Sequence, residues 1–242
     1  HYDTIAHDLD ATYEDVQPGL STPYGIARTH EMTLFWFDTL PSSHQLTGMA
    51  AQAAGIHRLM PTPAYLHRMR AFGTWSLPDR SNPTRQWMEE QLDSSFLFYK
   101  NAVEEHQWYG FWNYGDVMHT YDASRHSWRY DIGGYAWANT ELAPNNWLWY
   151  SFLRTGRADI FRMAEAMTRH TGDVDVYHLG PMKGLGTRHN VSHWGCGAKE
   201  ARIGQAAWKR FYYYLTTDER SGDLMREALD VETAMMALEP LR

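Results

Sequence analysis

The sequence predicts a mainly α-helical fold, an incomplete α/α toroid with a short β segment at its N-terminus, and three observations lead to it. Residues 42–60 and 84–105 carry apolar side chains at the spacing of an amphipathic helix. Two segments of the C-terminal half repeat one another at a constant offset. Aromatic segments rich in Gly, Asn and Asp separate the helical ones, and such residues favour turns and loops. Together these features are typical of helical hairpins arranged as a ring.

The N-terminal part of the chain differs from the rest. Residues 1–40 show no helical periodicity, and the apolar run Thr33–Phe37 predicts a strand. We therefore assign residues 1–40 to an N-terminal β or linker segment and residues 41–242 to the toroid. Prolines interrupt the chain between 61 and 83. In the helix that follows, we expect these side chains to be buried: Trp87, Leu92, Phe96, Leu97 and Val103.

The internal repeat lies in the C-terminal half. Leu153, Thr155 and Met163 recur as Leu215, Thr217 and Met225, each 62 residues later. Each copy reads as a helix, a tight polar turn and a second helix, which is an αα-hairpin. The alternative is coincidence between two amphipathic helices. Six hairpins at this period need more residues than the chain has, so we expect about four hairpins in an open arc, with Met163 and Met167 in the core.

Composition narrows the function classes. The net charge is −7 without a basic stripe, which argues against a nucleic-acid partner. No apolar run approaches the roughly 20 residues of a membrane span. Cys196 is the single cysteine, so no disulfide forms within the chain, and we expect a buried, inert thiol. The 11 Trp and 15 Tyr suit a surface that stacks on flat ligand faces, or else an aromatic-rich helical core.

A glycine-rich segment, residues 180–197, gathers polar side chains. It holds Lys183, Arg188, His189, Asn190, His193 and Trp194. Two further segments, 112–119 and 131–147, combine aromatic with polar residues. Their candidate binding residues are Trp112, Asn113, Asp116, His119, Tyr135, Trp137, Asn139 and Asn145. We predict that 112–119, 131–146 and 183–194 converge on one face, as a cleft for a charged sugar.

Structural roles compete with these assignments. Asn145 or Asn146 could instead cap the helix that begins near Trp147. Asp116 could close a turn, and His170 could contact the dipole at a helix C-terminus. His189 and His193 are four residues apart, but the glycines argue against a helix and no third ligand lies at a usual spacing, so we expect no metal site.

Four stretches of the chain resemble a known family, the exo-rhamnogalacturonan lyases, and the bacterial and fungal proteins grouped with them. They are GIARTHEMTLFW, WNYGDVMHTYD, DIGGYAWANTELAPNNWLWYSFLRTGR and RHNVSHWG. The resemblance extends from about residue 25 to residue 220. It implies an α/α toroid flanked by β-sandwich domains, with Thr33–Phe37 as the trailing edge of the preceding one. It also implies an acidic polysaccharide substrate, and we expect an extracellular or periplasmic enzyme that degrades pectin.

The implied reaction is β-elimination at a uronic acid. A base removes the proton at C5, and the charge that develops must be stabilised at the carboxylate. A histidine, or a tyrosine beside positive charge, suits the base. From this chemistry and motif position we assign catalytic roles to His189, Tyr135, Asn139 and Arg188. The remaining candidates would bind substrate. We expect no cofactor, with assistance by calcium left open.

Two other functions remain open. A glycoside hydrolase on the same ring, such as an unsaturated uronyl hydrolase, would use Asp116 or Asp131 as proton donor. A non-catalytic sugar-binding domain would use the same aromatic cleft. A lyase creates a C4–C5 double bond that absorbs in the ultraviolet, the hydrolase consumes it, and a binding domain does neither.

Overall fold

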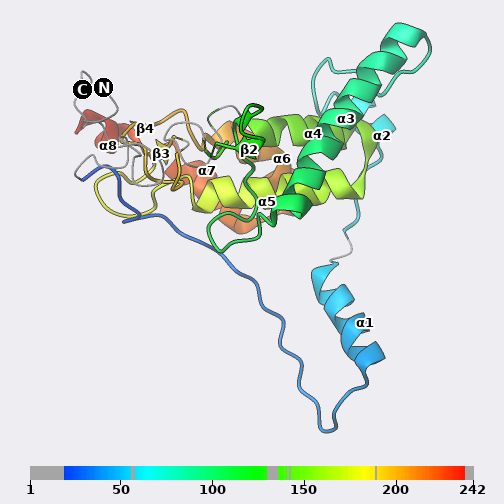
Figure 1. Ribbon diagram of the computed structural model, residues 1–242, viewed down its shortest axis with the longest axis horizontal. Coiled ribbons are helices and arrows are strands. Elements are labelled where there is room, and N and C mark those ends of the chain that lie inside the picture. The colour runs from blue at the N-terminus through cyan, green and yellow to red at the C-terminus, as the bar shows by residue number, and fades with distance from the viewer. Residues whose placement is uncertain are drawn as a thin grey trace.

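A computed structural model describes residues 19–55, 58–129, 136–139, 141, 143–188 and 190–237. In those residues the chain is mainly α-helical, with short two-residue strands (Figure 1). The helices are α1 (Ser43–Ala54), α2 (Pro63–Arg68), α3 (Pro83–His106), α4 (Pro144–Thr155), α5 (Ala158–Asp173), α6 (Ala206–Thr216), α7 (Glu219–Glu227) and α8 (Glu232–Met236). The strands are β1 (Tyr121–Asp122), β2 (Ser127–Trp128), β3 (Gly186–Thr187) and β4 (Lys199–Glu200). None of the described helices combines the length and apolar character needed to cross a bilayer.

Two helical hairpins form the centre of the toroid. α4 ends at Gly156, which has φ 69°, and α5 follows after one residue. α6 ends at Thr217, which has φ 55°, and the side chain of Asp218 then caps α7. Both hairpins predicted from the internal repeat are present. The equivalent turn residues Gly156 and Thr217 are 61 residues apart, one fewer than the sequence match suggested. The described residues contain these two tight hairpins rather than the expected four.

α5 is the central helix, because it packs against α4, α6 and α7. The core beneath it is aromatic: the Trp149 ring stacks on Tyr212 at 5.9 Å between centroids. Trp149 also donates a hydrogen bond from Nε1 to the hydroxyl of Thr168 at 2.8 Å, which satisfies the polar tip of a fully buried indole. Met167 is buried and Met163 packs against the core, as predicted.

The burial of side chains on α3 differs from the prediction. Phe96 is buried and Val103 packs against the core, but Trp87, Leu92 and Leu97 are exposed. The N-terminal half of α3 extends away from the body of the molecule (Figure 1). An amphipathic pattern identifies an apolar face, but it does not supply the element that covers it.

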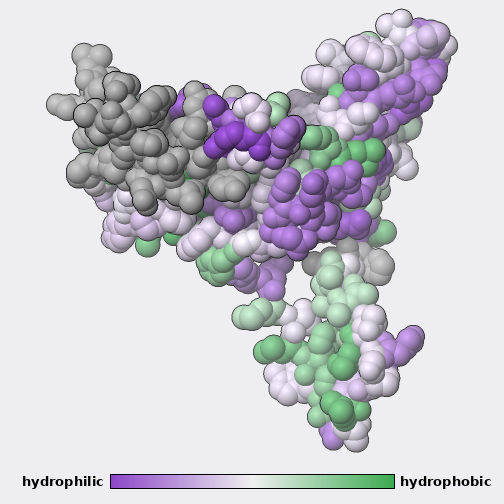
Figure 2. Space-filling view, in the orientation of Figure 1, coloured by the Kyte–Doolittle hydropathy of each residue, from purple (hydrophilic) through white to green (hydrophobic). Residues whose placement is uncertain are grey.

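The segment before α1 begins on the toroid and then leaves it. Leu20 and Ile26 pack against buried residues, and Thr29 donates its backbone N–H to Asp173 Oδ2 at 2.7 Å. Residues 32–42 then form an extended arm that leads to α1, whose residues are all outside the core (Figure 1). The predicted strand Thr33–Phe37 does not form in this structure, because these residues pair with no strand among the described residues. Apolar side chains gather on the arm and α1 (Figure 2), and Leu34 and Trp36 are 68% and 83% exposed.

Candidate functional site

The loops between the helices converge on one another. Trp137 donates from Nε1 to the carbonyl of Val191 at 3.1 Å, and the rings of Trp112 and Trp194 meet edge to face at 5.4 Å. A β-bridge joins Met118 to Trp137, and β3 pairs with β4 in the third loop. For the described residues, these contacts confirm the predicted convergence of 112–119, 131–146 and 183–194.

A buried polar cluster lies where these loops meet α5. It consists of Asp116, His170, Asp175 and His193, whose side chains are at most 2% exposed. His170 Nε2 lies 3.5 Å from Asp116 Oδ2 and 3.4 Å from Asp175 Oδ1. His193 Nδ1 lies 3.2 Å from Asp116 Oδ2. One cluster therefore joins a loop after α3, helix α5, the segment after α5 and the loop between β3 and β4.

Neighbouring groups fix the orientation of this buried polar cluster. Asp116 Oδ1 accepts backbone N–H bonds from Val117 at 2.8 Å and Asn139 at 3.1 Å. His170 Nδ1 lies 3.2 Å from the Tyr114 carbonyl oxygen, and His193 Nε2 lies 3.1 Å from the Asn113 amide oxygen. Within the described part of the chain, the remaining side-chain atoms that face the centre have no hydrogen-bond partner. They are His170 Nε2, His193 Nδ1 and both Asp175 oxygens.

Burial and mutual charge separate the protonation states within the cluster. Burial opposes a charged His170, but Asp175 and Asp116 outweigh it and raise the pKa of His170 to about 10. Burial, together with the charge of His170, lowers the pKa of His193 to about 4. Burial raises the pKa of Asp175 to about 6. His193 is therefore neutral at pH 7.

Several predicted site residues have structural contacts. Asn139 is buried, and its Nδ2 donates to the Thr187 carbonyl at 2.6 Å. Asn145 donates from Nδ2 to the Trp208 carbonyl at 3.0 Å and so links α4 to α6. Neither Asn145 nor Asn146 caps α4, because Ala143 is the N-cap and no side chain bonds there. Asn190 and the Cys196 thiol are also buried.

Other predicted residues are more accessible. Lys183 is exposed, whereas Trp112, His119 and Trp194 are half-buried. Arg188 contacts Glu141, with 3.3 Å between Nε and Oε2. Burial lowers the pKa of His119, whose Nδ1 lies 2.6 Å from the Thr120 hydroxyl. His189, Tyr135 and Asp131 lie outside the described residues.

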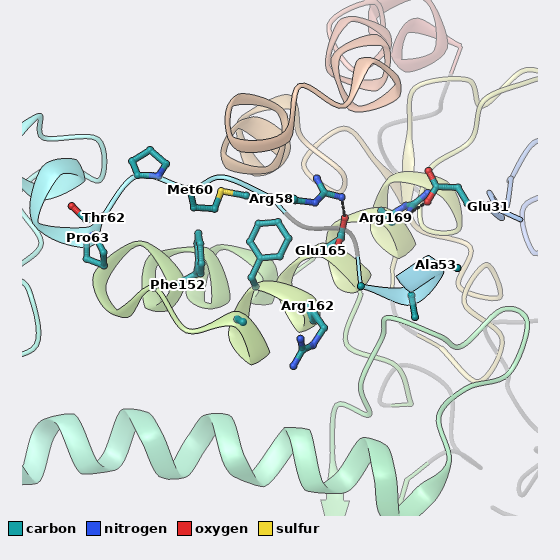
Figure 3. A pocket seen from close by; sticks show the side chains of 16 residues that line it. Glu31, Ala53, Arg58, Met60, Thr62, Pro63, Phe152, Arg162, Glu165 and Arg169 are labelled. Atoms are coloured by element: carbon teal, nitrogen blue, oxygen red, sulfur yellow. Dashed lines mark hydrogen bonds and ion pairs between the residues drawn. The ribbon is translucent and has the colours of Figure 1, made fainter. Parts of the chain in front are cut away.

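The structure also has a cleft that the sequence did not predict. We call it the arginine cleft, because it is lined by Arg28, Arg58, Arg162 and Arg169. Two adjoining cavities of about 540 Å³ and 290 Å³ share Arg162, Glu165 and Arg169 of α5. Figure 3 shows the larger of the two. The larger is also lined by Arg58 and the smaller by Arg28. The three α5 residues are three and four positions apart, and that helical spacing was the signal that could have revealed this face.

The arginines of this cleft differ in their partners. Arg58 pairs with Glu165 at 2.7 Å, and Arg169 pairs with Glu31 at 2.9 Å (Figure 3). Arg28 Nε is buried, and no described residue accepts a hydrogen bond from it. Burial lowers the pKa of Arg28 despite the nearby charge of Asp173.

Tyr114 lies beside Arg28. The Arg28 guanidinium stands 5.6 Å from the centre of the Tyr114 ring, and both residues line the smaller cavity. Tyr114 is 45% exposed, so its ring is accessible from that cavity. The cleft thus offers fixed positive charge and a phenol to a ligand that carries an anionic group.

Comparison with known proteins places the chain in a family. Residues 56–242 match the PcRGLX-like protein C-terminal alpha/alpha toroid domain, and residues 1–51 match the PcRGLX-like protein central beta sandwich domain. The chain is also 52% identical, over all of its 242 residues, to "Uncharacterized protein YetA" of Bacillus subtilis (strain 168). It spans 28% of that relative's length. These matches confirm the resemblance seen in the sequence: the chain belongs to the PcRGLX-like family, and it carries that family's α/α toroid domain next to a β-sandwich segment.

Proposed function

We propose that this chain is the catalytic toroid of a secreted lyase that cleaves a uronic-acid polymer, rhamnogalacturonan-like pectin, by β-elimination. Membership of the PcRGLX-like family supports a carbohydrate-active enzyme. The observation that carries the proposal is Arg28, a half-buried side chain whose buried Nε has no acceptor among the described residues, in a cleft lined by further arginines. A uronate carboxylate would supply the missing acceptor.

The arginine cleft suits the charge that β-elimination creates. When a base removes the C5 proton, negative charge moves onto the carboxylate, and the C4–O4 bond breaks as the C4–C5 double bond forms. Arg28 would bind that carboxylate, and Arg162 at the shared wall would add positive charge. Fixed cations in a partly buried site favour the transition state, because they need no reorganisation as charge develops.

Tyr114 is one base candidate beside these cations, and His30 lines the same cavity. The phenol of Tyr114 lines the same cavity as Arg28, whose guanidinium stands 5.6 Å from the centre of the Tyr114 ring. His189 and Tyr135 stay base candidates from the sequence. Arg188, Trp112 and Trp194 stay candidates for binding further sugar units on the loop face.

The hydrolase alternative needs a carboxylic acid that can reach a glycosidic oxygen. Of its two candidate donors, Asp116 is only 1% exposed, and Asp131 lies outside the described residues. The Oδ1 of Asp116 is already occupied by two backbone N–H groups. A sugar-binding domain without activity would use the same cleft, so a kinetic test is required.

The test compares two neighbouring tyrosines. Tyr114→Phe is expected to lower the rate of ultraviolet-absorbing product formation from rhamnogalacturonan by about 10²- to 10⁴-fold, the usual contribution of a general base. Tyr109→Phe is the matched control, because its ring stacks on Tyr114 at 5.9 Å and its hydroxyl bonds to Glu104 instead. It should keep the wild-type rate.

The same assay addresses Arg28. Arg28→Gln should raise KM for the acidic polymer, because the cation that holds the carboxylate is gone. An unchanged rate in Tyr114→Phe would transfer the base role to His189 or Tyr135. A wild-type protein that yields no ultraviolet-absorbing product from any uronate polymer would refute the proposed function.

A further inference from the structure

We propose that Asp116, His170, Asp175 and His193 form a structural site for one divalent transition-metal ion, with Zn²⁺ as the best fit. The inference does not depend on the proposed lyase activity, because it rests on the geometry of the buried polar cluster alone.

The distances in the cluster match the edges of a metal coordination shell. In tetrahedral Zn²⁺ sites, bonds of about 2.0–2.2 Å place neighbouring ligand atoms about 3.3–3.6 Å apart. The three nitrogen–oxygen distances are 3.2, 3.4 and 3.5 Å. One atom from each of the four residues lies within 4.8 Å of all the others. A modest contraction would bring all four onto one ion.

The histidine tautomers direct bare nitrogen atoms at the centre. The Tyr114 carbonyl can only accept, so His170 Nδ1 carries a proton and its Nε2 faces inward. The Asn113 amide oxygen likewise fixes the proton of His193 on Nε2 and leaves Nδ1 facing inward. Without an ion, His170 keeps a second proton between the two carboxylates. A divalent ion would displace that proton, so that in the loaded site both imidazoles are neutral and direct their inward lone pairs at the ion. A carbonyl or amide behind each ring is the arrangement that orients metal-binding histidines.

The unsatisfied atoms give an independent indication of a missing cation. Both oxygens of Asp175 are buried without a hydrogen bond to any described residue, and so are the inward nitrogens of the two histidines. Leaving such groups unpaired costs about 1–3 kcal/mol each, and more when they are charged. Once the ion has displaced the proton of His170, two carboxylates and two neutral imidazoles carry a combined charge of −2, which one divalent ion neutralises.

The ligand set selects the type of ion. Imidazole nitrogen is a preferred ligand of Zn²⁺ and other late transition metals, whereas Ca²⁺ and Mg²⁺ prefer shells of oxygen. Two histidines therefore argue against calcium, which the sequence analysis left open as an assisting ion. Four buried protein ligands leave no open position for substrate, which is typical of structural rather than catalytic zinc.

The ion would hold together the segments that carry the candidate site. Asp116 belongs to the loop after α3, His193 to the loop between β3 and β4, and His170 and Asp175 to the end of α5 and the residues after it. Trp112 and Trp194 lie close to these ligands in the sequence and contact each other. Metal binding would thus fix the loop face, and we revise the sequence-based expectation of no metal accordingly.

Metal content tests the inference directly. The purified chain is stripped with a chelator, loaded with Zn²⁺, freed of excess ion, and analysed for metal and melting temperature. We expect one Zn²⁺ per chain, a higher melting temperature than in the stripped protein, and no comparable effect of Ca²⁺ or Mg²⁺.

Two variants separate the site from adventitious binding. Asp175→Asn is nearly isosteric and should weaken Zn²⁺ binding by more than the about 10- to 100-fold that loss of an outer-shell partner costs. His178→Ala is the control, because His178 is close in sequence but faces Glu227 at 3.4 Å instead. It should retain one ion. The inference is overturned if the wild type binds no Zn²⁺, or if Asp175→Asn binds it as tightly as the wild type.

Discussion

Asp116 shows how much a single residue determines in this molecule. One of its oxygens accepts the backbone N–H groups of Val117 and Asn139, while the other faces His170 and His193. It therefore joins three segments that are far apart in the sequence. Arg28 is the opposite case, a cation whose buried Nε has no acceptor in the part of the chain that the structure describes. We interpret Asp116 as part of the scaffold and Arg28 as part of the binding surface.

A second residue-scale prediction concerns the loop after β3. His189→Ala should lower turnover by about 10²- to 10⁴-fold and leave the melting temperature nearly unchanged if His189 is the base. Arg188→Ala should weaken binding of acidic substrate alone. Arg202→Ala is the control, because Arg202 shares the partner Glu141 but is more exposed. Elimination rates and melting curves of the variants test these roles. If His189→Ala keeps the wild-type rate but melts at a lower temperature, His189 is a scaffold residue and not the base.

The sequence identified part of this chemistry. Asp116 and His193 were singled out because they lie in polar, glycine-containing segments. Asp175 was not, since the sequence does not show that Asp175 and His170, five residues before it, meet Asp116 and His193, which lie 59 residues before Asp175 and 18 after it. Arg28 lies in the stretch GIARTHEMTLFW, but the sequence indicates no role for it. A buried donor without an acceptor can be recognised only when the surrounding atoms are known.

At the scale of elements, the two hairpins were predictable and the long helix was not. Helix, tight turn and helix are local patterns, and residues with positive φ, Gly156 and Thr217, end α4 and α6. The burial of α3 depends on what packs against it. Only its later part meets the core, where Phe96 is 2% exposed. An apolar stripe in the sequence cannot distinguish these two halves.

The stability of the protein should depend on pH through an ion pair at the α4–α5 hairpin. Asp159, in the first turn of α5, bonds to Arg157 at 2.9 Å and Lys100 at 3.1 Å, and these cations lower its pKa below the ordinary 3.8. The unfolded chain therefore binds the proton more readily, so stability is fully present above pH 3.8 and falls as the pH drops further.

Urea unfolding at several pH values measures this effect. Asp159→Asn should lower the free energy of unfolding at pH 6 by up to about 1 kcal/mol, as for a partly exposed ion pair. The difference from wild type should disappear below the folded-state pKa. Asp223→Asn, in an exposed pair with Arg226, should change neither the free energy of unfolding at pH 6 nor its dependence on pH. A difference that stays constant down to the lowest pH would show that Asp159 acts through something other than its charge.

At the scale of the whole molecule, the toroid and the N-terminal arm behave differently. The hairpins bury a continuous aromatic core, whereas the arm exposes Leu34 and Trp36. Residues 1–51 match a β-sandwich domain, and a strand forms only when neighbouring strands supply its hydrogen bonds. We propose that further sandwich strands cover this arm in a longer polypeptide. The predicted strand at Thr33–Phe37 would then form there.

Product mass is the measurement that tests the central claim most directly. A polypeptide carrying this toroid with its complete β-sandwich is incubated with rhamnogalacturonan, and the fragments are weighed by mass spectrometry. Elimination adds no water across the broken bond, so one fragment should be lighter by one water than its hydrolytic counterpart and should absorb in the ultraviolet. Fragments that all carry the added water would instead show a hydrolase, and an intact polymer that nevertheless binds would show a sugar-binding domain. Either result would contradict the assignment of this chain as a lyase.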